Sequence, residues 1–343
     1  MGNGPETFFE LAARGLLKRS LFEPAIYEHK AALLGCSVAD VATSADRLVK
    51  AIMAEIETYR ADAVTVGVDV YNVEAEAIGC SLNYDVPTNE TPQLVEPLLD
   101  SLDGWEQLTV PDPERDGRMP LFLEAASQVR GRKPPEIVLR GAVSGPFSLA
   151  ASLVGFETLL MGMLDKPDDV RGLLNYALEV SLVFAAGYLR RGVDPVYFDS
   201  RCAPPLLSPQ LYAELVMPLH AELVLKTRAL GAKQVPIIIG GDTSGILPAL
   251  LKTGADYLLC DAPAPFGPFR EAAQSLGIFV RRNLDAGLVC RGPVRAIEAA
   301  AEESLAEAKG LCTFVLGTGI VPYDTPPAHI LAVAAIAKQG SSG

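Results

Sequence analysis

The sequence predicts a single (β/α)8 (TIM) barrel with an extended insertion after its second strand, and three observations support this fold class. Eight short apolar or β-branched runs recur along the 343 residues. Most of these runs are followed by a longer stretch with helical periodicity. Glycines mark the expected helix ends before the later runs, at Gly231, Gly254, Gly277 and Gly310. Eight strand-helix repeats indicate a parallel sheet that closes into a barrel.

The eight runs are the expected strands of the barrel, in chain order. They are Ser20–Ile26, Ala63–Asp69, Glu136–Ala142, Pro195–Ser200, Val235–Gly240, Asp256–Asp261, Gly277–Arg282 and Cys312–Gly317. The first run is the least typical strand, because it contains Glu23 and Pro24. The helices expected between the runs include Ser44–Tyr59, Val170–Arg190, Pro209–Leu230, Ser244–Lys252, Phe269–Leu276 and Pro293–Lys309.

One long segment, Ile78–Lys133, does not fit a minimal barrel. It contains too many prolines for one crossover helix, so we expect an insertion that forms a functional loop or a lid at the barrel mouth. No segment resembles a second domain or an internal repeat. Residues 1–339 are therefore expected to form one domain, and the terminal Gly340–Gly343 a disordered tail.

Composition excludes several classes of function. The chain is 49% hydrophobic and 21% charged, which predicts a large core and no extended disorder. A net charge of −13 argues against a nucleic-acid partner, which would need clustered Lys and Arg. No basic and apolar leader opens the sequence, and no apolar segment is expected to span a membrane. Six widely spaced cysteines are typical of reduced thiols, so a cytoplasmic protein is expected.

Polar residues follow the ends of the predicted strands, where the active site of a (β/α)8 barrel lies. The set in chain order is Glu28, His29, Asp69, Tyr71, Ser144, Asp199, Ser200, Arg201, Asp242, Thr243, Asp261, Asn283, Asp285 and Thr318. Aspartates that converge on one mouth repel each other unless a cation or a proton offsets their charge. The pattern therefore indicates a site for acid chemistry or for a positive group.

Several of these residues also have structural interpretations. Asp242 precedes an apolar helix and can act as its N-cap. His220 lies inside a long helical stretch, and His29 can be a surface helix residue. Cys202 and Cys260 lie near strand ends, but a lone cysteine is usually a small buried hydrophobe. No nucleotide-binding loop, zinc-protease motif or nucleophile elbow occurs in the sequence.

An ordered series of short strings resembles the uroporphyrinogen decarboxylase superfamily from about Ser20 to Lys338. The strings are Tyr27–Ala31, Glu74–Gly79, Gly145–Leu149, Phe198–Ser200, Gly240–Thr243, Asn283–Asp285, Leu316–Gly319 and Pro322–Pro327. The resemblance implies a (β/α)8 barrel. It also implies one of two activities: cofactor-free decarboxylation of uroporphyrinogen, or methyl transfer with corrinoid proteins in one-carbon metabolism.

The sequence resembles the methyltransferase branch more than the decarboxylases, especially in Glu74–Gly79 and Gly145–Leu149. The arginine-rich motif of the decarboxylases has no counterpart near Leu21–Tyr27. Their active-site tyrosine falls at Ser152 and their late histidine at Thr318. An acidic mouth without arginines is poorly suited to a substrate that carries many carboxylates.

The resemblance also concerns metal binding. Family members that methylate thiols hold zinc with a His-x-Cys pair and a later cysteine, and zinc lowers the pKa of the thiol. Those positions are Ile238, Gly240 and Ile320 here, and none of these side chains can ligate a metal. Zinc is therefore not expected at the usual family site. Other groups that could hold a metal are Asp199, Cys202, His220, Cys260 and Asp261, but their spacing does not demand one.

The resemblance implies a methyltransferase that moves a methyl group between a small molecule and a corrinoid (cobalamin) carried on a partner protein. In this hypothesis Asp69 or His29 supplies a proton, and Asp199 orients the substrate or a cation. The substrate-binding residues would be Tyr71, Ser144, Arg201, His220, Asp242, Asp261, Asn283 and Thr318. Two alternatives remain: a divergent decarboxylase that uses Asp69 as its acid, and a non-catalytic relative that binds a tetrapyrrole, a corrinoid protein or a small ligand.

Overall fold

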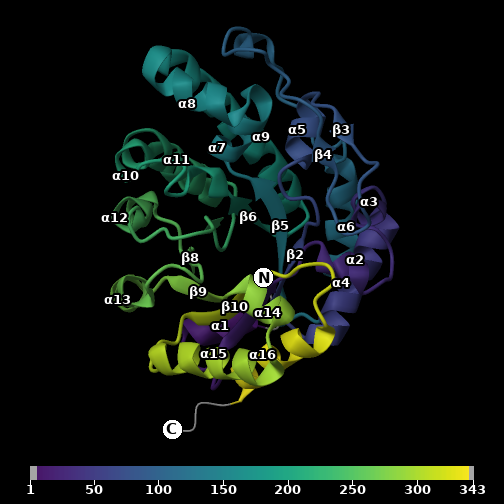
Figure 1. The fold of residues 1–343 in the computed structure, drawn as a ribbon, viewed down its shortest axis with the longest axis vertical. Coiled ribbons are helices and arrows are strands. Elements are labelled where there is room, and N and C mark those ends of the chain that lie inside the picture. The colour runs from purple at the N-terminus through teal and green to yellow at the C-terminus, as the bar shows by residue number, and fades with distance from the viewer. Residues whose placement is uncertain (1–5, 340–343) are drawn as a thin grey trace.

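The computed structural model describes residues 6–339 and contains an eight-stranded parallel sheet that curls into a nearly closed barrel (Figure 1). The strands are β1 Leu21–Ala25, β2 Ala63–Val66, β5 Val138–Ser144, β6 Asp194–Phe198, β7 Pro236–Ile238, β8 Tyr257–Cys260, β9 Phe279–Leu284 and β10 Phe314–Ile320. Their order in the sheet is β1-β10-β9-β8-β7-β6-β5-β2. Each strand overlaps one of the eight predicted runs, so the predicted (β/α)8 barrel is confirmed. The expected tail at 340–343 lies outside the described residues.

Helices cover the outside of the barrel (Figure 1). The longer ones are α4 Ala45–Tyr59, α6 Met119–Arg132, α9 Pro167–Arg190, α11 Met217–Ala229, α13 Phe266–Leu276, α15 Val294–Glu307 and α16 Pro327–Lys338. Ser44 caps α4 by accepting a hydrogen bond from the Arg47 amide. By length and composition alone α9 could cross a membrane, but it packs on β5 and β6 with most of its apolar side chains buried. It is a core helix of the barrel wall.

The insertion after β2 is shorter than the sequence predicted. The crossover begins with α5 (Val73–Ile78) and continues through the small antiparallel pair β3 (Leu82–Asn83) and β4 (Gln93–Leu94). It ends in α6, a regular helix of 14 residues that packs on α4. The assignment of Ile78–Lys133 as one insertion was therefore wrong in its last part. The prolines that argued against one crossover helix, Pro87, Pro92, Pro97, Pro111 and Pro113, all precede α6, and Pro120 lies in its first turn, where proline is tolerated.

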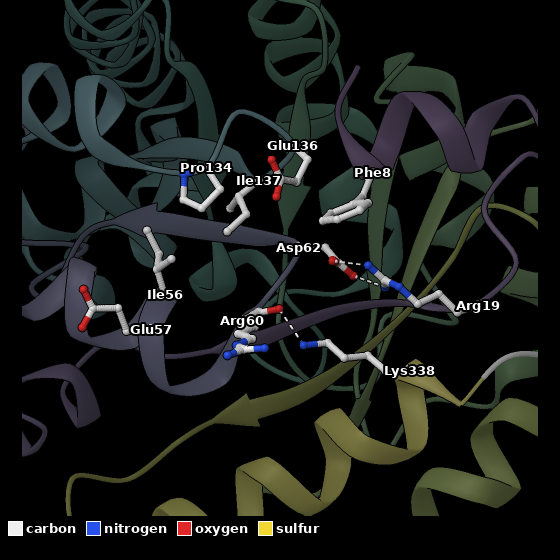
Figure 2. Close-up of a pocket in the computed structure, with 10 residues that line it drawn as sticks. All are labelled: Phe8, Arg19, Ile56, Glu57, Arg60, Asp62, Pro134, Glu136, Ile137 and Lys338. Carbon is white, nitrogen blue, oxygen red and sulfur yellow. Dashed lines mark hydrogen bonds and ion pairs between the residues drawn. The ribbon is translucent and has the colours of Figure 1, made fainter. Parts of the chain in front are cut away.

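Asp62 joins β1 to β2, the two edges that share no strand ladder. Its amide donates to the Phe22 carbonyl at 2.8 Å, and its carboxylate accepts from the Phe22 amide at 2.8 Å. Both terminal nitrogens of Arg19 bind the same carboxylate at 2.7 Å. Figure 2 shows this pair beside a cavity of about 500 Å³ at the amino-terminal end of the strands. One buried side chain thus closes the barrel at the face opposite the expected active site.

The barrel interior explains the unusual first strand. Glu23 points into the barrel, where its carboxylate lies 3.6 Å from Arg140 and 3.5 Å from Arg281 and accepts a 2.7 Å hydrogen bond from the Tyr257 hydroxyl. The Arg140 guanidinium also lies over the Phe9 ring of the short helix α1 (Phe8–Ala13), 5.0 Å from its centroid. Buried charges of opposite sign replace part of the aliphatic filling that a barrel of this size usually has.

Candidate active site

Asp69 lies just beyond the end of β2 and is held by residues of the crossover that follows. Only 2% of its surface is exposed. One carboxylate oxygen is 2.8 Å from the Arg118 guanidinium, and the other accepts a 2.6 Å hydrogen bond from the Asn72 amide. Burial raises the pKa of Asp69, and the charge of Arg118 opposes that shift. Nothing local in the sequence marks Arg118 as a partner, because it lies 49 residues away.

Arg118 ties the insertion to this carboxylate. Its Nε is 2.5 Å from Glu76 of α5, and its Nη1 donates to the Ala42 carbonyl at 3.2 Å. The Tyr84 hydroxyl, from the β3–β4 segment, donates to Glu76, and the Tyr84 ring lies 5.3 Å from the centre of the guanidinium. Asp69 is therefore oriented by groups from α5, the insertion and the start of α6.

Glu28 follows β1 and has a free carboxylate oxygen. Its Oε2 is buried and has no hydrogen-bond partner among residues 6–339. Burial raises the pKa of Glu28, and the negative charge of Asp69 raises it further. The side chain lines a cavity of about 360 Å³ between the β4 region of the insertion and the loop after β10. The sequence placed Glu28 at a strand end but did not distinguish it from its neighbours.

His29, the other predicted proton donor, is enclosed by protein groups. Its Nδ1 is 2.9 Å from the Tyr323 carbonyl, and its Nε2 is 2.6 Å from the Tyr59 hydroxyl. Because a carbonyl only accepts, Nδ1 carries the hydrogen and Nε2 accepts from Tyr59. Burial lowers the pKa of His29 and favours this neutral form. Both ring nitrogens are occupied, which leaves neither free for a substrate.

Asp199 and His220 meet in a buried network behind the barrel mouth. The Asp199 carboxylate accepts from the Ser148 amide at 2.6 Å and the Phe147 amide at 3.1 Å, at the start of α7 (Pro146–Val154). His220 Nε2 lies 2.9 Å from the same carboxylate, and its Nδ1 is 3.1 Å from the Tyr212 hydroxyl. The carboxylate therefore caps α7 and binds a histidine from α11. This buried hydrogen-bond network stabilises the barrel mouth from the protein interior.

The same network contains the three residues that come nearest to a metal centre. The ligand atoms of Asp199, Cys202 and His220 lie within 4.8 Å of one another. However, both Asp199 oxygens already accept hydrogen bonds, and Cys202 Sγ is 2.8 Å from the Asp199 carbonyl. Burial raises the pKa of the Cys202 thiol well above its usual value, which disfavours the thiolate that a metal needs. These residues fit a hydrogen-bond network better than a metal.

The positions of the family's zinc ligands do not fit a metal either. Ile238 is buried at the end of β7. Gly240, two residues after β7, has no side chain, and its amide donates to the Ser200 hydroxyl at 3.0 Å. Ile320 ends β10 and is 54% exposed. None of the three offers a donor atom from its side chain. These three positions therefore cannot hold a metal through their side chains.

Ser144 and Arg201 are held by neighbours at the ends of β5 and β6. Glu74 accepts from the Ser144 amide at 2.6 Å and from its hydroxyl at 2.9 Å, and burial raises the pKa of Glu74 to about 7. Arg201 donates to the Ser152 hydroxyl at 2.7 Å and lies 5.9 Å from the centroid of the Tyr71 ring. Tyr71 and Arg201 remain partly exposed and can contact a ligand, whereas Ser144 is fully buried.

The remaining predicted site residues separate into two groups. Asp261 and Asn283 lie together, with the Asn283 amide donating to Asp261 at 3.0 Å. Thr318 accepts from the Ala25 amide at 3.1 Å and so ties β10 to β1. Asp242 is exposed and accepts from the Ser244 amide at 3.0 Å within a turn, but it does not cap the next helix, α12 (Leu247–Leu250), whose N-cap position is Ile246, so the N-cap role that the sequence allowed was wrong. Asp261 and Asn283 thus remain at the mouth, while Thr318 and Asp242 fix the backbone.

The fold and the site define the chain as a (β/α)8 barrel with polar groups at the carboxyl ends of its strands. A family model described as "Uroporphyrinogen decarboxylase (URO-D)" matches residues 24–340. The chain belongs to the uroporphyrinogen decarboxylase family.

Relatives within this family carry two kinds of name. The methylcobamide:CoM methyltransferase MtaA of Methanosarcina barkeri is 24% identical over 308 residues, which are 88% of this chain and 87% of that protein. The methylcobamide:CoM methyltransferase MtbA of Methanosarcina mazei is 24% identical over 81% of this chain and 80% of its own length. The uroporphyrinogen decarboxylase of Pseudomonas paraeruginosa is 26% identical over 78% and 76%. A solved methyltransferase from Methanosarcina mazei shares the fold, with a TM-score of 0.85, 22% identity and coverage of 98% of this chain and 99% of that one.

Proposed function

We propose that the protein transfers a methyl group from a small-molecule donor to the cobalt of a corrinoid carried on a partner protein. The likeness to MtaA and MtbA over more than four-fifths of the chain supports methyl transfer. The observation that carries the proposal is that arginines at the mouth are already bound by protein groups. Arg118 is occupied by two carboxylates, and Arg282 by the backbone carbonyls of Asp261 and Ala264. No arginine cluster among residues 6–339 faces the mouth ready for a polycarboxylate such as uroporphyrinogen.

These residues fit methyl transfer from a small-molecule donor to the corrinoid better than methyl transfer from the corrinoid to a thiol. Methylation of a thiol at neutral pH needs a group that stabilises the thiolate, and Ile238, Gly240 and Ile320 cannot hold a metal for that purpose. A donor whose methyl group is bound to oxygen or nitrogen instead needs a proton on its leaving group. The mouth contains carboxyl groups with raised pKa values, at the half-buried Glu28 and the buried Asp69.

The chain's own residues would bind and orient such a donor. Asp69, held by Arg118 and Asn72, has a fixed carboxylate that can orient the substrate. Tyr71 and Arg201 would contact the donor, and the corrinoid protein would dock over the same mouth. A reduced corrinoid requires a reducing compartment. We therefore propose that the protein acts in the cytoplasm, and its free cysteines are consistent with such a compartment.

The test uses cob(I)alamin, generated with a chemical reductant, as the methyl acceptor. The protein is mixed with this probe and with a panel of O-methyl and N-methyl donors, and methylcobalamin formation is followed by absorbance. We expect donor-dependent and protein-dependent methylcobalamin formation for at least one donor class. Release of CO2 from uroporphyrinogen with no methyl transfer over the whole panel would favour the decarboxylase alternative. Binding of cobalamin with neither reaction would favour the non-catalytic one.

A further inference from the structure

We infer that Glu28 is the catalytic acid that protonates the leaving group, and that the methyl donor is an O-methyl compound. This inference rests on the proposed methyl transfer and adds its proton donor and its substrate class. In the step, the carbon-oxygen bond of the donor breaks and the oxygen keeps the bonding pair while it takes the proton of Glu28. The methyl carbon bonds to cobalt(I), which provides two electrons and becomes cobalt(III). An alcohol or phenol leaves, and solvent reprotonates the Glu28 carboxylate.

Glu28, which is half-buried, differs from the buried carboxylates of the mouth in its hydrogen bonds. Asp69 binds Arg118 and Asn72, Asp199 accepts three N–H donors, and Glu74 accepts from Ser144. Glu28 Oε2 is buried with no hydrogen-bond partner in the described chain. A buried oxygen without a partner is costly, and a substrate group that accepts its proton would remove that cost. Glu28 is thus free to exchange a proton with a ligand.

Its position suits this role. Glu28 lines the cavity of about 360 Å³ that lies between the insertion and the loop after β10. Ile320, one of the three positions that cannot ligate a metal, borders the same cavity. With no side chain there to hold a Lewis acid, the developing negative charge on a leaving oxygen must be met by a proton. The cavity therefore contains an acidic side chain and enough space for a small organic substrate.

The charges around Glu28 favour its protonated form. Glu90 and Asp324 line the same cavity, Asp69 lies nearby, and no Lys, Arg or His is among the residues that line it. Lys30 acts in the opposite direction, but its ammonium is 3.2 Å from Glu55 and donates to the Thr65 carbonyl. The adjacent His29 is neutral. Surroundings of this sign hold a proton on a carboxyl group and oppose binding of an anionic substrate.

The test compares Glu28→Gln with Glu57→Gln, a matched control at an exposed carboxylate on the opposite end of the barrel. We expect Glu28→Gln to slow methyl transfer from an alkyl methyl ether to cob(I)alamin by about 100-fold, with little change in the KM for the donor. Glu57→Gln should stay within about threefold of wild type. The wild-type rate should fall as the pH rises and Glu28 ionises, and the residual rate of Glu28→Gln should lose that dependence.

A series of aryl methyl ethers separates acid catalysis from damage to the fold. A nitro-substituted phenolate leaves without a proton, so the defect of Glu28→Gln should shrink toward wild type as the phenol becomes more acidic. An equal defect for every leaving group, or a pH profile like that of the wild type, would overturn the assignment of Glu28. A wild-type protein that transfers methyl groups only from N-methyl donors would overturn the O-methyl class. Wild-type protein with no methyl transfer at all would instead refute the proposed function.

Discussion

Replacing Asp62 by alanine is expected to open the barrel seam. The change removes the acceptor of the Phe22 amide and both hydrogen bonds of Arg19 to the same carboxylate. An unpaired buried amide costs about 1 to 3 kcal/mol, and the lost charged hydrogen bonds add roughly 2 kcal/mol, because Arg19 is only 18% exposed. We therefore expect a loss of about 4 kcal/mol. Against a typical stability of about 5 to 15 kcal/mol, this is a large fraction.

Equilibrium unfolding in urea, followed by far-UV circular dichroism, measures this loss. Asp62→Asn keeps an acceptor for the Phe22 amide but not the charge, so its loss should be smaller, about 1 to 2 kcal/mol. Glu57→Ala is the control, because Glu57 is exposed on the rim of the same cavity (Figure 2) and should change stability by less than about 0.5 kcal/mol. An Asp62→Ala protein as stable as this control would refute the role of Asp62 in closing the barrel.

Two further predictions concern the supports of the mouth. Gly145→Ala should destabilise the protein by about 2 kcal/mol or more and slow methyl transfer, because the new Cβ would lie 2.4 Å from Asp199. Gly245→Ala is the control. Its nearest contact would be at 3.4 Å, so it should be nearly neutral in the same urea titration. The folded pKa of Glu74 is raised to about 7 from 4.5, so its contribution to stability is complete below about pH 4 and is lost as the pH rises toward 7. Relative to Glu74→Gln, the wild type should therefore lose roughly 1 to 3 kcal/mol between pH 5 and 7, and a constant difference across that range would contradict the raised pKa.

Most of the strands could be predicted from the sequence because they are buried on both faces and appear as short runs rich in apolar or β-branched residues. The partners of Glu23 could not, since Arg140 and Arg281 come from strands far along the chain and their charges meet only inside the closed barrel. The end of the insertion was predicted wrongly for a different reason. The prolines that indicated an irregular segment lie between residues 87 and 113, and the start of α6 after them was not recognised.

The strand-end rule located residues of the mouth but could not assign their roles. Asp69 and Asp199 follow their strands as predicted, yet their hydrogen-bond partners come from distant segments: Arg118 lies 49 residues from Asp69 and His220 lies 21 residues from Asp199. Such partners determine whether a carboxylate has a structural role or is available to react with a substrate. A single sequence shows which residues follow a strand, but not which of their oxygens remain free.

The summed charge of the mouth is therefore a weaker guide to chemistry than the hydrogen bonds of each carboxylate. The sequence suggested that converging aspartates need a cation or a proton to offset their charge. In the structure Asp69 has an arginine, Asp261 has the Asn283 amide and a backbone amide, and Asp242 and Asp285 accept hydrogen bonds from nearby backbone amides. Their charges are met locally, so no added cation is needed to hold them together. The buried carboxyl oxygen of the mouth that lacks a donor belongs to Glu28, and it is this group that can change its protonation when a substrate binds.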